Sequence, residues 1–241
     1  RANVVIMDIN QMQLEKTLAS ISHDFPEAHV ITRVVDVTIS QSIEECIQAV
    51  CLEFEKIDIL VNSAAIDAKF DEDSDTSGYS KFTKFPKTMW EQSISVNLTG
   101  TFLITQAVCR IMEKYQKGSI ILLGSNYGLV GPDQRIYTKD GYSNQSFKPP
   151  DYSVCKAGLI GLTKYLASYY AGTEIRVNML TPSGVYNNQD EEFVKKYSRN
   201  TILGRMSNKE EYWGAILFLA SNASSYMTGG NLVIDGGWTA L

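Results

Sequence analysis

The segment GSIILLG (118–124) is an unbroken apolar run of strand length, and a long helical pattern lies on each side of it in the sequence. The first pattern covers roughly residues 87–115 and the second about residues 152–170. A strand that is apolar on both faces is typical of a parallel sheet with helices on both sides. The segment therefore predicts an α/β fold with this strand near its centre.

The same alternation of strand and helix patterns continues in both directions along the chain. Further apolar runs of strand length are NVVIMD, HVITRVVDV, DILVNSA, EIRVNML and NLVIDGG. Helical patterns separate them, which predicts a doubly wound parallel sheet of the Rossmann type. Because no repeat, linker or change in composition interrupts the chain, we expect residues 1–241 to form a single domain.

Composition disfavours several classes of function. A formal net charge of −5 argues against nucleic acid or an anionic membrane as the main partner. The four cysteines form no CxxC pair, which predicts a reduced cytoplasmic protein without disulfides or a metal site. We find no apolar run near the roughly 18 residues that a membrane span requires. Neither a nucleic acid nor a membrane is therefore expected as the main partner.

Tyr152 and Lys156 are four residues apart in the second helical pattern, so both lie on one helix face. A cation near a phenol favours the phenolate, and the pair predicts a tyrosine whose pKa is lowered toward neutrality for proton transfer. The spacing alone is common by chance. An ordinary tyrosine and lysine on an amphipathic helix are the alternative.

Three further polar residues strengthen the catalytic interpretation, although each has a structural alternative. Ser125 follows the central strand, where its hydroxyl can bond a substrate oxygen or merely cap a turn. Asn62 ends the strand of VNSAA, where it can line a ligand site or a tight turn. Asn97 is a poor helix former inside a helical pattern, and it is either functional or a core amide with satisfied hydrogen bonds.

The order of these motifs resembles the short-chain dehydrogenase/reductase family over nearly the whole chain. The resemblance rests on VVDV, VNSAA, VNLTG, LLGSNYG, YSVCK, IRVNMLTPSGV and LVIDGGW. It implies that Tyr152 is the general acid/base, that Ser125 holds the reacting oxygen, and that Lys156 lowers the tyrosine pKa and binds the nicotinamide ribose. It also implies that Asn97 supports a proton relay behind Lys156.

The resemblance further implies a nicotinamide dinucleotide as cofactor, and a homodimer or homotetramer formed through the two long helices. The cofactor-binding positions it implies are Asp8, Ile9, Asp36, Val37, Asn62, Ala64, Tyr152, Lys156, Pro182, Gly184 and Val185. Asp8 ends the strand NVVIMD, where a carboxylate binds ribose hydroxyls and repels a 2′-phosphate. The sequence therefore predicts NAD(H) in preference to NADP(H).

The chain departs from the family pattern at three places. It begins at the family's second strand, so the first strand, the TGxxxGxG turn and the first helix are expected to be absent from this chain. That turn normally holds the pyrophosphate. The threonine that usually follows the PG motif is missing from PSGVYNNQ, and Ser125 and Tyr152 are separated by an inserted segment, residues 131–148.

Two long connections, residues 66–85 and 126–150, follow strands at the edge where such sheets bind ligands. Disordered or decorative loops are the alternative. The insert is polar and aromatic, which predicts a sugar-like substrate, with Arg135 as an anion anchor and Tyr137 as a further contact. Arg135 could instead pair with an acidic neighbour, such as one in DEDSD (71–75).

Two functions thus remain open at this stage. The first is an NAD-dependent oxidoreductase that acts on a secondary alcohol or ketone of a polar substrate, similar to family members of bacterial surface-sugar and flagellin-modification pathways. The second is a catalytically weak or inactive binding or structural protein that retains the fold but lacks the phosphate-binding turn.

Overall fold

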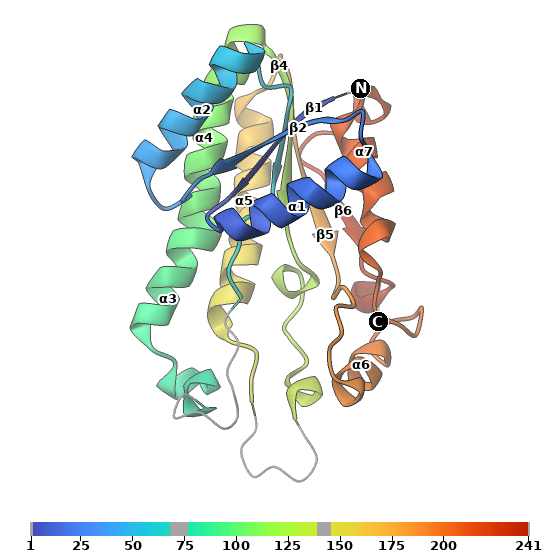
Figure 1. The fold of residues 1–241 in the computed structure, drawn as a ribbon. Helices are drawn as coiled ribbons and strands as arrows, with labels where there is room; N and C mark the ends of the chain where they lie inside the picture. The colour runs from blue at the N-terminus through green and yellow to red at the C-terminus, as the bar shows by residue number, and fades with distance from the viewer. Residues whose placement is uncertain (1, 68–76, 139–145, 241) are drawn as a thin grey trace.

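The computed structural model of the chain describes residues 2–67, 77–138 and 146–240. Strands and helices alternate along it in the predicted order, and every strand ladder is parallel (Figure 1). The strands are β1 (Asn3–Asp8), β2 (His29–Val34), β3 (Ile59–Asn62), β4 (Lys117–Leu123), β5 (Glu174–Pro182) and β6 (Asn231–Ile234). The helices are α1 (Gln11–Asp24), α2 (Ser40–Phe54), α3 (Lys87–Ser93), α4 (Thr101–Tyr115), α5 (Pro150–Tyr169), α6 (Glu191–Ser198) and α7 (Trp213–Ala220).

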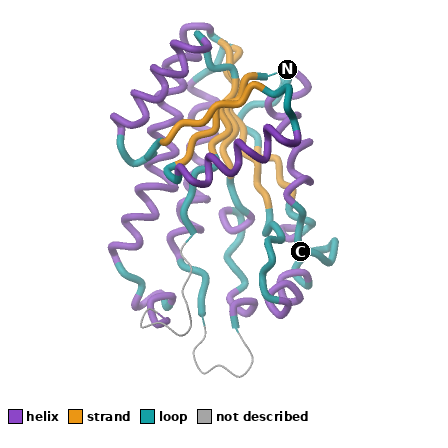
Figure 2. The backbone as a smooth tube through the Cα atoms, in the orientation of Figure 1, coloured by secondary structure: helices purple, strands orange, loops and turns teal. Residues whose placement is uncertain are grey.

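The strand ladders form two groups. One joins β1 to β2, the other has the order β3-β4-β5-β6, and no ladder connects β1 with β3 in the described residues (Figure 2). Val4 and Val61, on β1 and β3, are 41% and 40% exposed. The structure describes the sheet from Asn3 onward. It does not support the expected absence of a first strand and a first helix from this chain, and that absence stays a prediction.

Alternating side chains of the central strand β4 pack on opposite faces of the sheet. Ile120 and Leu122 contact the core formed with α2, α4 and α5, whereas Ile121 contacts the core formed with α7. All three side chains are fully buried. Two buried faces explain why this strand is apolar without alternation, and they confirm the prediction of helices on both sides.

The predicted helix over residues 87–115 is continuous but not uniform. A π-helical segment, Ile94–Gly100, lies between α3 and α4 and contains Asn97. By length and composition this helix could cross a membrane. Its apolar side chains Val108 and Met112 are nevertheless buried against the sheet, so it is a core helix.

The carboxyl ends of the parallel strands share one edge, and the long connections gather there, at the lower end of Figure 1. The connection between β4 and α5 contains two short 3-10 helices, η4 (Asn126–Gly128) and η5 (Gln134–Tyr137). Helix α6 also lies at this end and was not predicted, because its eight residues are too few to show a clear apolar period. This edge carries the candidate site.

Candidate active site

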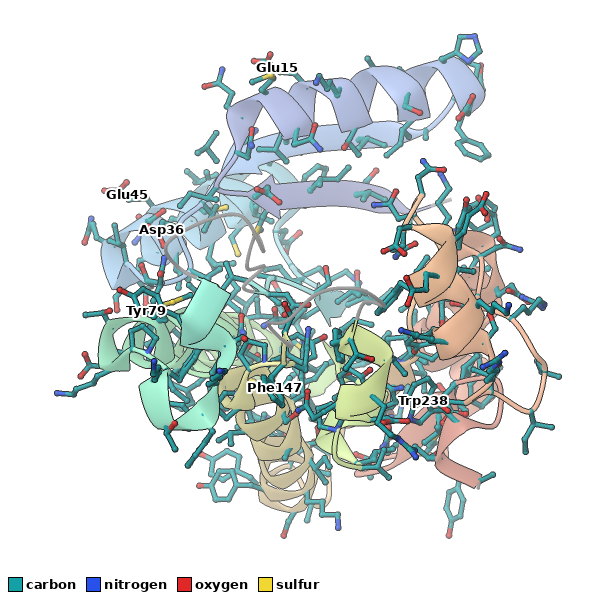
Figure 3. All side chains as sticks on the ribbon, turned by 90° about the horizontal axis from the view of Figure 1, so that it is seen from below. Glu15, Asp36, Glu45, Tyr79, Phe147 and Trp238 are labelled. Carbon is teal, nitrogen blue, oxygen red and sulfur yellow. The ribbon has the colours of Figure 1, made fainter. Side chains whose placement is uncertain are left out.

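A pocket of about 500 Å³ opens beyond the carboxyl ends of β4 and β5. Segments from β4, the insert, α5, β5 and α6 line it, and they include Ser125, Tyr137, Lys148, Tyr152, Gly184 and Tyr197. Figure 3 views the molecule from this end. It shows Phe147 beside α5, Trp238 near η4 and η5, and Asp36 farther away beside α2.

Tyr152 lies in the first turn of α5, two residues after Pro150, which starts this helix. Its ring packs against an aromatic cluster that contains Tyr127, Tyr197 and Trp238. The Lys156 ammonium lies 5.6 Å from the ring centroid of Tyr152. The structure therefore brings the predicted pair together on one helix face, at the wall of the pocket.

Lys156 is only 4% exposed, and its ammonium donates a 2.7 Å hydrogen bond to the carbonyl oxygen of Leu123 at the end of β4. Burial disfavours the charged amine and lowers the pKa of Lys156 to about 8. The side chain thus ties α5 to the central strand and carries an amine that titrates near neutral pH.

The pKa of Tyr152 does not follow the prediction made from the spacing. Burial raises this pKa above its ordinary value, the negative charge of Asp67 raises it further, and a hydrogen bond with Ser125 lowers it. The ammonium of Lys156 is itself desolvated and donates to the Leu123 carbonyl. The phenol is therefore protonated at neutral pH, the form that can donate a proton to a carbonyl oxygen.

Ser125 follows Gly124 at the end of β4 and caps η4, where its hydroxyl oxygen accepts from the Tyr127 N–H. A close contact between η4 and α5 brings this serine to the tyrosine. A Cβ on Gly128 would lie 2.8 Å from the backbone carbon of Lys156. Only glycine allows this approach, so Gly128 sets the distance between Ser125 and Tyr152.

Asn97 is 1% exposed, and its amide is fully engaged by other groups. The amide nitrogen donates to the Ile66 carbonyl and the Ser93 hydroxyl, and the amide oxygen accepts from the Ile66 N–H. The alternative stated for Asn97, a core amide with satisfied hydrogen bonds, thus describes this side chain well. Its π-helical position directs the amide at the start of the connection after β3.

The predicted cofactor positions lie at the carboxyl ends of four strands. Asp8 ends β1, is exposed, and accepts from the Asn10 N–H through Oδ1. Asp36, by contrast, directs its carboxylate at both the N–H and the hydroxyl of Thr38. The remaining predicted positions follow β1, β2, β3 and β5, and are Ile9, Val37, Asn62, Ala64, Pro182, Gly184 and Val185.

These strand ends fit the two ends of a nicotinamide dinucleotide. Asp8 offers an exposed carboxylate for ribose hydroxyls, and the small, exposed Ala64 leaves the end of β3 open to a flat ligand. Pro182, Gly184 and Val185 line the pocket beside Tyr152, where a nicotinamide would lie. A bound cofactor of this class supplies or accepts a hydride.

Arg135 does not hold the position predicted for it. Its side chain is 88% exposed and forms an ion pair with Asp133 at 2.8 Å, whereas Tyr137 and Lys148 line the pocket. The alternative of an acidic partner is therefore correct, although that partner is Asp133. The segment DEDSD (71–75) lies outside the described residues. Because the arginine and its partner are only two residues apart, their turn satisfies both charges locally.

The pocket lining also includes Asp67, Lys148 and Tyr197, which the sequence did not predict as site residues. Lys148 lies four residues before Tyr152, and this proximity was the available signal. Tyr197 accepts from the Gly184 N–H and contacts the Tyr152 cluster from α6, a helix that was itself not predicted. No local pattern marks such a residue.

Comparison with known proteins agrees with this geometry. A family model described as enoyl-(acyl carrier protein) reductase matches residues 1–239. The 3-oxoacyl-[acyl-carrier-protein] reductase FabG of Thermotoga maritima is 33% identical over 240 residues, covering 98% of this chain and 87% of the relative. The chain belongs to the short-chain dehydrogenase/reductase family. It is therefore an oxidoreductase of the NAD(P)-dependent type.

Other members of the short-chain dehydrogenase/reductase family differ in what their names say they act on. The post-translational flagellin modification protein A of Campylobacter coli is 29% identical and covers 97% of this chain and 87% of the relative. The D-threitol dehydrogenase of Mycolicibacterium smegmatis is also 29% identical, with 99% and 84% covered. The family resemblance alone leaves the substrate undecided.

Solved structures of family members match the fold closely. A short-chain dehydrogenase from Leptospira borgpetersenii with bound NAD+ has a TM-score of 0.79 and 32% identity, with 99% of this chain and 93% of that chain covered. A gluconate 5-dehydrogenase from Burkholderia cenocepacia in complex with NADP and tartrate has a TM-score of 0.81 and 28% identity, with 100% and 86% covered.

The close contact at Gly128 predicts that adding one methyl group there lowers both stability and activity. Gly128→Ala forces α5 and η4 apart, which we expect to lower the unfolding free energy by about 1–3 kcal/mol and kcat/KM by about tenfold or more. Gly161→Ala, on α5, is the control, since a Cβ there meets nothing within 4 Å. Denaturant titration and steady-state kinetics measure both effects. Wild-type stability and rate in Gly128→Ala would contradict this account.

The buried Lys156 predicts an unusual titration. Its pKa of about 8 lies below the ordinary value, so folding disfavours its protonated form. The stability cost is full below about pH 8 and is relieved as pH rises from there toward the ordinary value of about 10.5. NMR titration of lysine side chains in the cofactor-free protein should show one amine near pH 8 that is absent from Lys156→Met. If every lysine titrates above about pH 10, the assignment is wrong.

Proposed function

We propose that this chain is an NAD(H)-dependent oxidoreductase that interconverts a secondary alcohol and a ketone on a small, hydroxyl-rich substrate. Tyr152 is the proton donor and acceptor, and Ser125 binds the reacting oxygen. The single observation that carries the proposal is that Ser125 and Lys156, from different elements, both reach Tyr152 at the pocket wall.

The proton chemistry follows from the states of these groups. In the reductive direction, the protonated Tyr152 hydroxyl donates to the carbonyl oxygen as negative charge develops there, while Ser125 holds that oxygen in place. Lys156 lies behind the ring, where its charge stabilises the tyrosinate that forms after proton donation. Asn97 fixes Ile66 and so positions the connection at the pocket rather than touching the reacting atoms.

A polyol or sugar-derived substrate fits the lining better than an acyl chain. The pocket contains the hydroxyls of Ser125, Tyr137 and Tyr197 together with charged side chains of both signs. The D-threitol dehydrogenase relative favours such a substrate, whereas the 3-oxoacyl-[acyl-carrier-protein] reductase relatives favour an acyl substrate. The hydroxyls and charged groups in the lining decide our choice, because a buried hydroxyl or charge that faces an alkyl chain loses its hydrogen bonds.

The second candidate is a catalytically weak or inactive binding protein with the same fold. It is favoured by the two separate strand groups and by the lack of a glycine-rich sequence after β1 or β3 that could hold a pyrophosphate. Equilibrium titration of this chain with NAD+ separates the two functions. A dissociation constant in the micromolar range supports the enzyme, and a lack of binding at millimolar NAD+ supports the alternative.

We further propose a single-domain, cytoplasmic protein that forms a homodimer or homotetramer through α4 and α5. Both helices carry large exposed apolar or aromatic side chains, a common feature of faces that bury against a partner. These side chains are Phe102, Tyr115, Val154, Tyr165 and Tyr169, with exposures from 43% to 64%.

Replacement of the proton donor tests the proposal directly. Tyr152→Phe removes the hydroxyl but keeps the ring in its aromatic cluster, so kcat should fall about 100-fold or more with little change in stability. Tyr226→Phe, at a fully exposed position outside the pocket, is the matched control and should retain the wild-type rate. Steady-state kinetics and thermal unfolding measure both. Near-wild-type turnover in Tyr152→Phe would refute its role.

Cofactor preference depends on Asp8. Its exposed carboxylate should accept from ribose hydroxyls and repel a 2′-phosphate, so kcat/KM should be higher with NAD+ than with NADP+. Asp8→Ala should reduce this preference about tenfold, whereas Asp24→Ala, at the far end of α1, should leave it unchanged. A clear preference of the wild type for NADP+ would overturn the NAD assignment.

A further inference from the structure

Lys148 places a cation next to the proposed proton donor from outside α5. Its side chain is 10% exposed, and its ammonium lies 4.5 Å from the Tyr152 ring centroid, closer than the ammonium of Lys156. The side-chain amide of Gln134 holds the Lys148 backbone at both its N–H (2.8 Å) and its carbonyl (3.3 Å). The insert therefore fixes Lys148 firmly at the pocket wall.

Asp67 is the partner of this lysine and comes from the other long connection. One carboxylate oxygen of Asp67 lies 2.6 Å from the Lys148 ammonium, and the other oxygen also accepts from it. The amide of Asn97 holds the neighbouring Ile66 backbone in the same two-pronged way. Each member of the ion pair is thus positioned by a separate side-chain amide.

We propose that the Asp67–Lys148 ion pair selects the substrate by binding a hydroxyl on the carbon next to the reacting one, so that the site prefers neutral vicinal diols. This inference rests on the proposed oxidoreductase function and names its substrate class. Both charged groups line the pocket that contains Ser125 and Tyr152. A hydroxyl can accept from the ammonium and donate to the carboxylate at once, and an ion pair offers both partners together.

The remaining charged groups of the lining are already engaged in the structure of α6. Asp190 accepts from the Phe193 N–H and caps that helix, and Glu192 pairs with Lys196. In contrast, Asp67 is 46% exposed although it is paired, so its carboxylate can still reach a ligand. The Asp67–Lys148 pair is therefore the charged element that a substrate at Tyr152 meets.

The same pair disfavours two other substrate classes. An alkyl chain would cover the two charges without replacing the hydrogen bonds that water gives them, which is costly. A carboxylate next to the reacting carbon would be repelled by Asp67, which already neutralises Lys148. The preference for a neutral diol thus arises from one matched pair of charges, and removal of either charge should change it in a predictable direction.

Three alcohols with the same four-carbon skeleton test this inference: butane-2,3-diol, butan-2-ol and 2-hydroxybutanoate. The wild type should oxidise the diol with a kcat/KM about tenfold or more above that for butan-2-ol. Lys148→Met should lower this ratio about tenfold, because the donor to the second hydroxyl is lost. Asp67→Asn should raise kcat/KM for 2-hydroxybutanoate relative to the diol about tenfold, because Lys148 loses its anionic partner.

Two further variants serve as controls for the charge and for the position of Lys148. Lys148→Arg retains the charge and should restore part of the diol preference, and Lys209→Met changes an exposed lysine outside the pocket and should leave all ratios unchanged. If Lys148→Met does not fold, the Asp67→Asn ratios alone carry the test. Unchanged ratios in the variants, or a uniform loss for all three alcohols, overturn the inference. Turnover without a diol preference in the wild type overturns the inference alone, whereas a lack of turnover of any alcohol overturns the proposed function as well.

Discussion

The hydrogen bond from the buried Lys156 ammonium to the Leu123 carbonyl joins helix α5 to the end of the central strand. The rest of the site depends on this connection. It fixes the first turn of α5, and therefore Tyr152, relative to β4 and Ser125. The glycine at 128 then lets η4 lie directly against the α5 backbone. A strand that is buried on both faces cannot shift easily. Ser125 and the Leu123 carbonyl, at the end of this strand, are therefore held in fixed positions.

This connection has an electrostatic cost that is typical of functional sites. Burial lowers the pKa of Lys156 and raises the pKa of Tyr152, so it favours the neutral form of each group. Groups perturbed in this way and located in a pocket are the ones that proton transfer requires. The protein therefore gives up some stability at the point where its proposed chemistry takes place.

The two long connections add specificity to this rigid base. Asn97 and Gln134 are both side-chain amides, and each binds the N–H and carbonyl of one residue in a connection. They bring Asp67 and Lys148 together over the pocket although these residues come from separate loops. The sheet and helices are shared with many relatives, whereas loops at the carboxyl edge can vary without disturbing the core. Substrate choice is thus expected to reside in this pair.

The sequence by itself determined the alternation of apolar strands and helices, the parallel sheet, the extent of the helix over residues 87–115, and the placement of Lys156 next to Tyr152. These features depend on periodicity and on spacing within single elements, which are local properties of the chain. Only the tertiary structure decided that Lys148 meets Asp67 from 81 residues away and that the Tyr152 pKa rises instead of falling. Ion pairs between distant segments and the burial of a phenol depend on how separate elements pack, and no local pattern encodes that packing.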